Sequence, residues 1–187
     1  MIKRLIDCSD NILVWDDIAN DLPILKKDIL NEYEKRKNFL IEHHTGYRMP
    51  MDESMPSNNK LDEYFAPCLK EYIKEFGLGT EEDYFFSQWI LIGWTVEDRG
   101  MPLHNDHMAD VSFTSPDFQQ PFLTAIFYLS HECEGGNLEF PDSNFILKPN
   151  SGTLIIFPSE LNHEVLNYIS GERIVIQKFV FPYQVSP

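Results

Sequence analysis

PFLTAIFYLSHECEGGNLEFPDSNFILKPNSGTLIIFPSELNHEVLNYISGERIVIQKFVF, residues 121–181, is the stretch that decides the fold. Its segments are short, rich in β-branched and aromatic residues, and separated by Gly, Pro, Asn and Asp, which is typical of strands. The same texture begins near residue 84. The predicted strand segments are YFFSQWILIGW, PFLTAIFYLS, NLEFP, NFILKP, GTLIIFP, HEVLNY and RIVIQKFVF. Their close spacing predicts an antiparallel sandwich or barrel.

The N-terminal half has a different texture. Residues 20–40 are predicted to form a helix, with Asp21 as N-cap and apolar residues at helical spacing. Residues 60–76 are predicted to form a second helix that Gly77 ends. Residues 45–60 are rich in turn formers and are expected to form a loop, with the Met-rich part 49–56 mobile or acting as a lid. The sequence therefore predicts a helical layer packed on a mainly β core.

Composition excludes several functional classes. The chain has 187 residues and a net charge of −15, with 15 Lys and Arg against 30 Asp and Glu. Binding to nucleic acid or to an anionic membrane needs clustered positive charge, so neither is expected. The three cysteines are widely spaced, which argues against a disulfide framework. We see no signal-peptide pattern and no transmembrane run, and therefore expect a cytoplasmic protein. The oligomeric state cannot be predicted.

His104-Asn105-Asp106 is the first motif that suggests chemistry. On an extended backbone, residues i and i+2 project to the same side, so both side chains could reach one point. An imidazole nitrogen and a carboxylate oxygen are suitable ligands for a divalent ion. Taken alone, the motif is a weak signal, and polar surface residues or a hydrogen-bonded pair would explain it better than a metal site.

His163 and Arg173 supply the other two parts. His163 follows the predicted strand GTLIIFP, and alone it could be a polar residue at a strand end. Arg173 should share one strand face with Val175, Gln177 and Phe179. A buried guanidinium needs an anion, which could be an internal acid or a ligand. Two histidines and a carboxylate form a facial triad with open coordination positions. An arginine beyond it could hold a carboxylate-bearing cosubstrate.

At this point the sequence resembles a known family, the prolyl 4-hydroxylase-like branch of the 2-oxoglutarate/iron(II)-dependent dioxygenases. The resemblance covers about residues 84–183. It is carried by His104-Asn105-Asp106, TAIFYLS (124–130), EGGNLEFPD (134–142), the GTLIIFP strand and HEVLNYISGER (163–173). It implies an α+β, mainly β fold: a double-stranded β-helix (jelly roll, cupin-like) with N-terminal helices packed on one sheet. We expect a single domain over residues 1–187, with a helical support region (1–83) and a catalytic core (84–187).

The resemblance also implies roles for individual residues. His104, Asp106 and His163 would bind iron, and Arg173 would pair with the distal carboxylate of 2-oxoglutarate. Tyr128 would contribute its hydroxyl to the same carboxylate. The remaining residues expected around the cosubstrate are Thr124, Leu138 and Trp94, of which Trp94 stands where many relatives have tyrosine. Lys178 is the competing cation, but strand alternation places it on the face opposite Arg173.

The implied activity is hydroxylation of an unactivated C–H bond, with a prolyl residue of a peptide or protein as the expected substrate. A free amino acid or another small molecule is the alternative. Asp106 favours hydroxylation over halogenation, because related halogenases replace this carboxylate with a small residue. The implied cofactors are Fe(II), 2-oxoglutarate as cosubstrate and O2, with ascorbate as a candidate reductant. The other classes considered are a non-enzymatic β-helix binding module and a cupin-like metalloenzyme without a 2-oxo acid.

Overall fold

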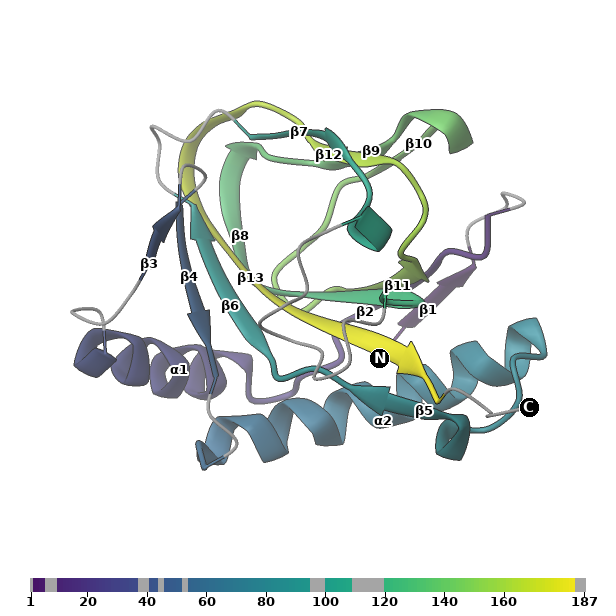
Figure 1. Cartoon of the computed structure of the whole chain (residues 1–187). Coiled ribbons are helices and arrows are strands. Elements are labelled where there is room, and N and C mark those ends of the chain that lie inside the picture. The colour runs from purple at the N-terminus through teal and green to yellow at the C-terminus, as the bar shows by residue number, and fades with distance from the viewer. Residues whose placement is uncertain are drawn as a thin grey trace.

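Two antiparallel sheets form the core of the protein. The computed structural model describes residues 2–5, 10–36, 41–43, 46–51, 54–94, 100–108 and 120–183. Among these residues, the large sheet has nine strands in the order β1-β2-β11-β8-β13-β6-β4-β3, with β5 pairing to β13. The small sheet has the order β10-β9-β12-β7. Figure 1 shows the small sheet lying across the large one, so that the two enclose a barrel.

The strands of the large sheet are β1 (Ile2–Leu5), β2 (Leu13–Asp16), β3 (Ile41–His43), β4 (Gly46–Pro50), β5 (Tyr84–Phe86), β6 (Ile90–Trp94), β8 (Leu123–Gly135), β11 (Leu154–Pro158) and β13 (Tyr168–Pro182). Those of the small sheet are β7 (Met101–His104), β9 (Leu138–Phe140), β10 (Phe145–Leu147) and β12 (His163–Val165). Short 3-10 turns are η2 (Glu81–Asp83), η3 (Asp106–Met108) and η4 (Pro141–Ser143).

Two helices cover the outer face of the large sheet (Figure 1). They are α1 (Leu22–Arg36) and α2 (Pro56–Phe76). Gly77 ends α2 with φ of 64°, in the left-handed conformation predicted for the stop. Neither α1 nor α2 combines the length and the apolar character that a bilayer-spanning helix needs.

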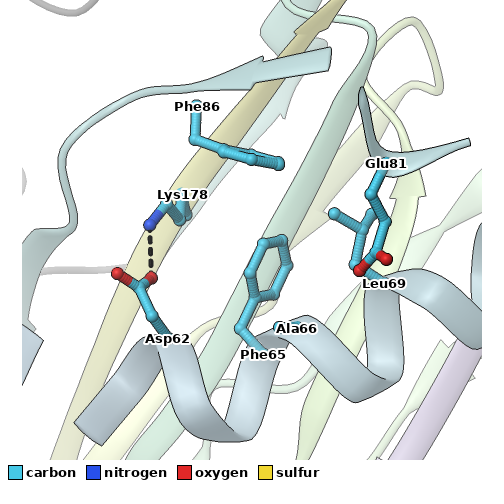
Figure 2. A pocket seen from close by; sticks show the side chains of 7 residues that line it. All are labelled: Asp62, Phe65, Ala66, Leu69, Glu81, Phe86 and Lys178. Carbon is cyan, nitrogen blue, oxygen red and sulfur yellow. Dashed lines mark hydrogen bonds and ion pairs between the residues drawn. The ribbon is translucent and has the colours of Figure 1, made fainter. Parts of the chain in front are cut away.

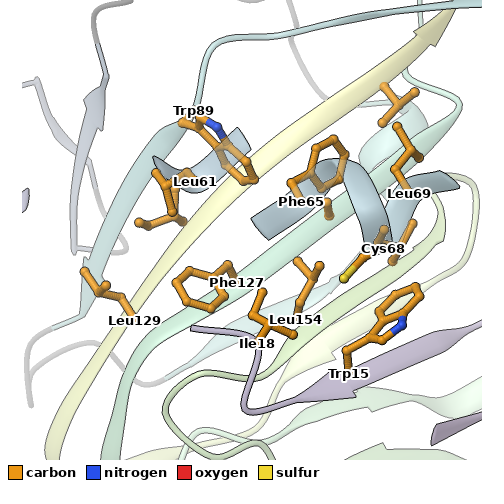
Figure 3. Packing of buried hydrophobic residues seen from close by; sticks show 14 of the residues in the cluster. Trp15, Ile18, Leu61, Phe65, Cys68, Leu69, Trp89, Phe127, Leu129 and Leu154 are labelled. Carbon is orange, nitrogen blue, oxygen red and sulfur yellow. The ribbon is translucent and has the colours of Figure 1, made fainter. Parts of the chain in front are cut away.

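Strand alternation divides the apolar side chains into two clusters. The cluster between the large sheet and the helices includes Trp15, Leu69 and Phe127 (Figure 3). The cluster inside the barrel includes Tyr128 and Leu138. Phe127 and Tyr128 are adjacent on β8 and face opposite sides, as the two-residue period of a strand requires. The expectation of a double-stranded β-helix with helices packed on one sheet is confirmed.

The N-terminal half differs from the prediction because it is not only helical. Strands β1 and β2 extend the large sheet beyond β11, and β3 and β4 extend it beyond β6. Residues 46–50 form β4 and α2 already begins at Pro56, so the predicted 45–60 loop is wrong in both places. The division at residue 84 stays a prediction, since the two halves share one sheet.

The Met-rich segment also differs from the expectation of a mobile loop or lid. Met49, Met51 and Met55 are all buried in the cluster that packs against the helices. The Asn58 side chain donates a hydrogen bond to the backbone carbonyl of Met51 at 3.2 Å. These methionines therefore anchor the connection between β4 and α2. Residues 52 and 53 lie outside the described part of the chain.

Candidate active site

Three side chains converge inside the barrel at the end of the small sheet. His104 on β7 is the register partner of His163 on β12, and the two ring centroids are 4.3 Å apart. Asp106 begins η3 directly after β7. One ligand atom from each residue lies within 4.8 Å of the others. Asp106 reaches this point from a 3-10 turn and not from an extended strand, so the sequence argument named the right pair but the wrong local backbone.

Backbone carbonyls orient both histidine rings. His104 Nδ1 lies 2.8 Å from the Pro102 carbonyl, and His163 Nδ1 lies 2.9 Å from the Leu161 carbonyl. A carbonyl only accepts, so each Nδ1 carries the proton and each Nε2 keeps its lone pair. The two Nε2 atoms lie 3.8 and 3.6 Å from the Asp106 carboxylate oxygens. Both lone pairs are therefore available to a cation at this point.

Burial keeps His163 neutral. Burial lowers the pKa of His163, the Asp106 carboxylate opposes that shift, and His104 adds to it. Phe140 and Phe157 pack against the His163 ring with centroids 5.7 and 5.0 Å away. A neutral imidazole is the form that binds a metal ion. The apolar surroundings thus favour the ligating form of this residue.

Two side chains of the large sheet hold the Asp106 carboxylate. Thr124 Oγ1 on β8 donates to Asp106 Oδ2 at 2.9 Å, and Gln177 Nε2 on β13 donates to the same oxygen at 3.3 Å. Ser159 Oγ lies 2.8 Å from Thr124 Oγ1, which can accept its proton. All four side chains are buried. These contacts fix the carboxylate that would be the third metal ligand.

Arg173 and Tyr128 form a second polar group within the barrel. Arg173 is 1% exposed, and its Cζ lies 5.4 Å from the centroid of the Tyr128 ring. The Tyr128 hydroxyl is fully buried and has no hydrogen-bond partner among the described residues. Burial raises the pKa of Tyr128, while the guanidinium opposes the shift. A buried phenol hydroxyl beside a buried cation suits a bound anion that accepts from both.

The double glycine of the predicted motif has a physical reason in this pocket. Arg173 Nε donates to the Gly136 carbonyl at 3.1 Å. A Cβ atom at Gly136 would lie 3.1 Å from Arg173 Cδ, and φ of 67° disfavours other residues there. Leu138, two residues further on, is fully buried in the same interior cluster as Tyr128. The glycine therefore gives the Arg173 side chain room beside the backbone that precedes β9.

Lys178 lies on the other face of β13, as strand alternation predicted. Its Nζ is 2.5 Å from Asp62 Oδ1 on α2 and 4.6 Å from the centroid of Trp89. A cavity of about 280 Å³ lies beside this pair, and its lining includes Phe65 and Phe86. Figure 2 shows these side chains around the ion pair of Lys178 and Asp62. The cavity lies between α2 and the outer face of the sheet. Lys178 therefore fastens the helix to the sheet and does not reach the barrel interior.

Three neighbouring residues, Trp94, His107 and Ser130, have partners outside the triad. Trp94 pairs with Arg173 through the backbone, and its side chain lies outside the described part of the structure. The exposed His107 has Nδ1 3.4 Å from the Pro121 carbonyl. Ser130 donates to Glu172, which also pairs with Lys26 on α1.

Sequence reasoning missed two polar residues. Gln177 was placed on the face of Arg173 by strand alternation, but nothing marked it as a partner of Asp106. Arg48 lies on β4, in a segment whose composition predicts a loop, and the Asp106 carboxylate influences its pKa, which indicates that its side chain lies on the side of the triad. Strand alternation could have found the first, whereas the sequence carries no signal for the second.

The donor set fits the cofactors that the sequence suggested. Two imidazole nitrogens and one carboxylate oxygen leave positions open on an octahedral ion, which is the donor set of non-haem Fe(II) oxygenases. The buried hydroxyl of Tyr128 next to Arg173 provides donors for a carboxylate deeper in the barrel.

Comparison with solved structures gives the same fold. The chain superposes on the viral collagen prolyl hydroxylase of Paramecium Bursaria Chlorella virus-1, in its 2OG complex, with a TM-score of 0.70 and 17% identity over 94% of this chain and 98% of that one. A Pseudomonas putida prolyl-4-hydroxylase gives 0.67 and 18% identity, with coverage of 93% and 94%.

A third structure was solved with a metal ion. HygX of Streptomyces hygroscopicus, with nickel and 2-oxoglutarate bound, gives a TM-score of 0.62 at 15% identity, with coverage of 94% and 84%. No curated protein sequence matches the chain.

The family comparison covers the strands that build the site. The model of the 2OG-Fe(II) oxygenase superfamily matches residues 92–181, which include the triad, Tyr128 and Arg173. This match confirms the resemblance drawn from the sequence motifs. Over residues 92–181, just under half of its length, the chain is thus similar to the iron(II)- and 2-oxoglutarate-dependent oxygenases of the 2OG-Fe(II) oxygenase superfamily.

Proposed function

We propose that the protein hydroxylates an unactivated C–H bond, with a prolyl residue of a peptide or protein as its substrate. The observation that carries this proposal is the meeting of His104, Asp106 and His163 within 4.8 Å, at the end of a barrel whose interior also holds a buried arginine. Superposition on prolyl hydroxylases supports the substrate class. A further structural neighbour, from Trichoplax adhaerens, was solved with a peptide of hypoxia inducible factor. A cytoplasmic location remains part of the proposal.

In the proposed reaction each group of residues has a separate task. His104, Asp106 and His163 hold Fe(II), which supplies the oxidising chemistry with O2 and 2-oxoglutarate once these are bound. Thr124 and Gln177 keep the Asp106 carboxylate turned toward the ion. Arg173 and Tyr128 hold the distal carboxylate of 2-oxoglutarate. The apolar wall that includes Leu138 keeps water from this end of the barrel.

The proposal is tested first by binding. Fe(II) and 2-oxoglutarate added together without oxygen should give a weak visible charge-transfer band in the wild-type protein. Asp106→Ala and His163→Ala should abolish it. His107→Ala is the matched control, because this exposed histidine is next to Asp106 in sequence and outside the triad, so the band should persist.

Turnover tests the substrate. Candidate peptides, including proline-rich ones, should gain the mass of one oxygen atom by mass spectrometry while succinate is released. If Asp106→Ala or His163→Ala produced succinate at the wild-type rate, the assignment of the triad would be wrong. A wild-type protein without the band would instead favour a binding module or a metalloenzyme that needs no 2-oxo acid.

A further inference from the structure

Arg48 faces the barrel from β4, the second strand from one edge of the large sheet. On β4 it is the register partner of Ile92 on β6, and Ile92 is the partner of Val175 on β13. Ile92 and Val175 both belong to the interior cluster, whereas the adjacent Met49 belongs to the cluster facing the helices. Cross-strand partners share a face, so Arg48 lies on the interior face, in the row next to Arg173.

Within the described part of the chain, the charge of Arg48 is only partly compensated. Its Nε is buried and has no hydrogen-bond partner among the described residues. Burial lowers the pKa of Arg48, and the Asp106 carboxylate opposes that shift. A guanidinium does not give up its proton in a protein, so the cost of burial must be offset by an anion.

Asp106 does not serve as that anion once the site is loaded. Its carboxylate accepts hydrogen bonds from Thr124 and Gln177 and faces Nε2 of both triad histidines. A divalent ion held there would take up the carboxylate charge and repel Arg48. The two negative charges of bound 2-oxoglutarate and the one of Asp106 would balance the positive charges of the divalent ion and Arg173. Among the residues that the structure describes, Arg48 would then leave one positive charge at the triad without a counterion.

We propose that Arg48 binds a carboxylate of the substrate, and therefore that the enzyme selects substrates with a carboxylate close to the C–H bond to be oxidised. The carboxylate belongs either to a C-terminal or free amino acid or to an acidic side chain beside the reacting residue. Both present the same planar anion, which a guanidinium binds through two parallel hydrogen bonds. This inference rests on the proposed function and narrows its substrate class.

Matched acids and amides test the inference by binding alone. The Fe(II) and 2-oxoglutarate complex is titrated without oxygen, and binding is followed by calorimetry and by the change in the visible band. The first pair of probes is N-acetyl-L-proline and N-acetyl-L-prolinamide. The second pair is the N-acetyl prolyl dipeptide amides with Asp or Asn after the proline. The first pair detects a main-chain carboxylate and the second a side-chain carboxylate.

In the wild-type protein at least one acid should bind roughly 10- to 100-fold more tightly than its amide, the range expected for a charge-assisted hydrogen bond. Arg48→Gln should remove that preference. The affinities of this variant for the amide probes and for 2-oxoglutarate should stay within about threefold of the wild-type values. Arg48→Lys should retain part of it. Lys70→Gln, an equal change in net charge on the exposed side of α2, is the control and should behave as wild type.

Three outcomes overturn the inference: no acid binds, acids and amides bind equally to the wild type, or Arg48→Gln weakens 2-oxoglutarate itself. The last would make Arg48 part of the cosubstrate site. Failure of the proposed function looks different, because the wild type would then show no 2-oxoglutarate-dependent band before any probe is added.

Discussion

Replacing Arg173 tests the cosubstrate pocket most directly. Arg173 is 1% exposed, and its Nε already donates to the Gly136 carbonyl. A carboxylate held by the two terminal nitrogens would accept two charge-assisted hydrogen bonds, each worth about 1.5–3 kcal/mol. Their joint loss of about 3–6 kcal/mol corresponds to a dissociation constant raised by about 100-fold to 10,000-fold. Arg173→Gln should therefore weaken 2-oxoglutarate by at least about 100-fold, as anaerobic titration of the visible band would show.

The same strand supplies the matched control. Lys178 is also a buried cation on β13, but it faces α2 and pairs with Asp62. Lys178→Gln should leave 2-oxoglutarate affinity unchanged, although it removes the contact with the helix. Arg173→Lys should give an intermediate affinity, because lysine keeps the charge but lacks the planar fork. Thermal unfolding of each variant shows whether it is folded. The reasoning is refuted if the Arg173 variant binds as wild type or if the Lys178 variant does not.

Three further predictions concern metal affinity, acid sensitivity and the core. Thr124→Val removes the 2.9 Å hydrogen bond to Asp106 and should weaken Fe(II) about 10- to 100-fold without unfolding the protein; equal metal affinity would show that this bond does not orient the carboxylate. Burial, with help from Arg173, lowers the pKa of His131 to about 4, so the folded state loses stability as pH falls from about 6.5, the value in an unfolded chain, toward 4. His131→Gln should flatten that part of the unfolding curve, and an unchanged pH profile would contradict it. Leu69→Ala, under the helix layer, should cost about 2–5 kcal/mol in chemical denaturation, and a loss below 1 kcal/mol would mean that this cluster is loosely packed.

The features predicted well from sequence are those set by local periodicity. The two-residue period of β13 placed Arg173, Val175 and Gln177 on one face and Lys178 on the other, and the structure has them so. The helix signals in the sequence predicted both α1 and α2. For most ends of these helices, the predicted boundary lies within a few residues of the observed one. Gly77 was correctly identified as the stop of α2.

The features missed depend on distant partners. Strand β2 pairs with β11, about 140 residues later in the chain. The four residues of β2 alone do not predict that pairing. Strand β4 contains glycine, arginine and proline, a composition typical of a turn, yet pairing with β6 makes it a strand. Because β4 was read as a loop, Arg48 could not be placed beside the triad.

Three consecutive residues of β13 contact both the helix layer and the candidate metal site. Ile176 packs against the helix layer, Gln177 donates a hydrogen bond to Asp106, and Lys178 forms an ion pair with Asp62. A shift of α2 would displace β13 and with it the Gln177 side-chain amide, which donates a hydrogen bond to the Asp106 carboxylate. Laboratory evolution of this protein for new substrates should therefore conserve the apolar packing of β13 against α2, whereas a single polar contact behind the sheet, such as that of Lys178 with Asp62, can be exchanged without changing the iron site.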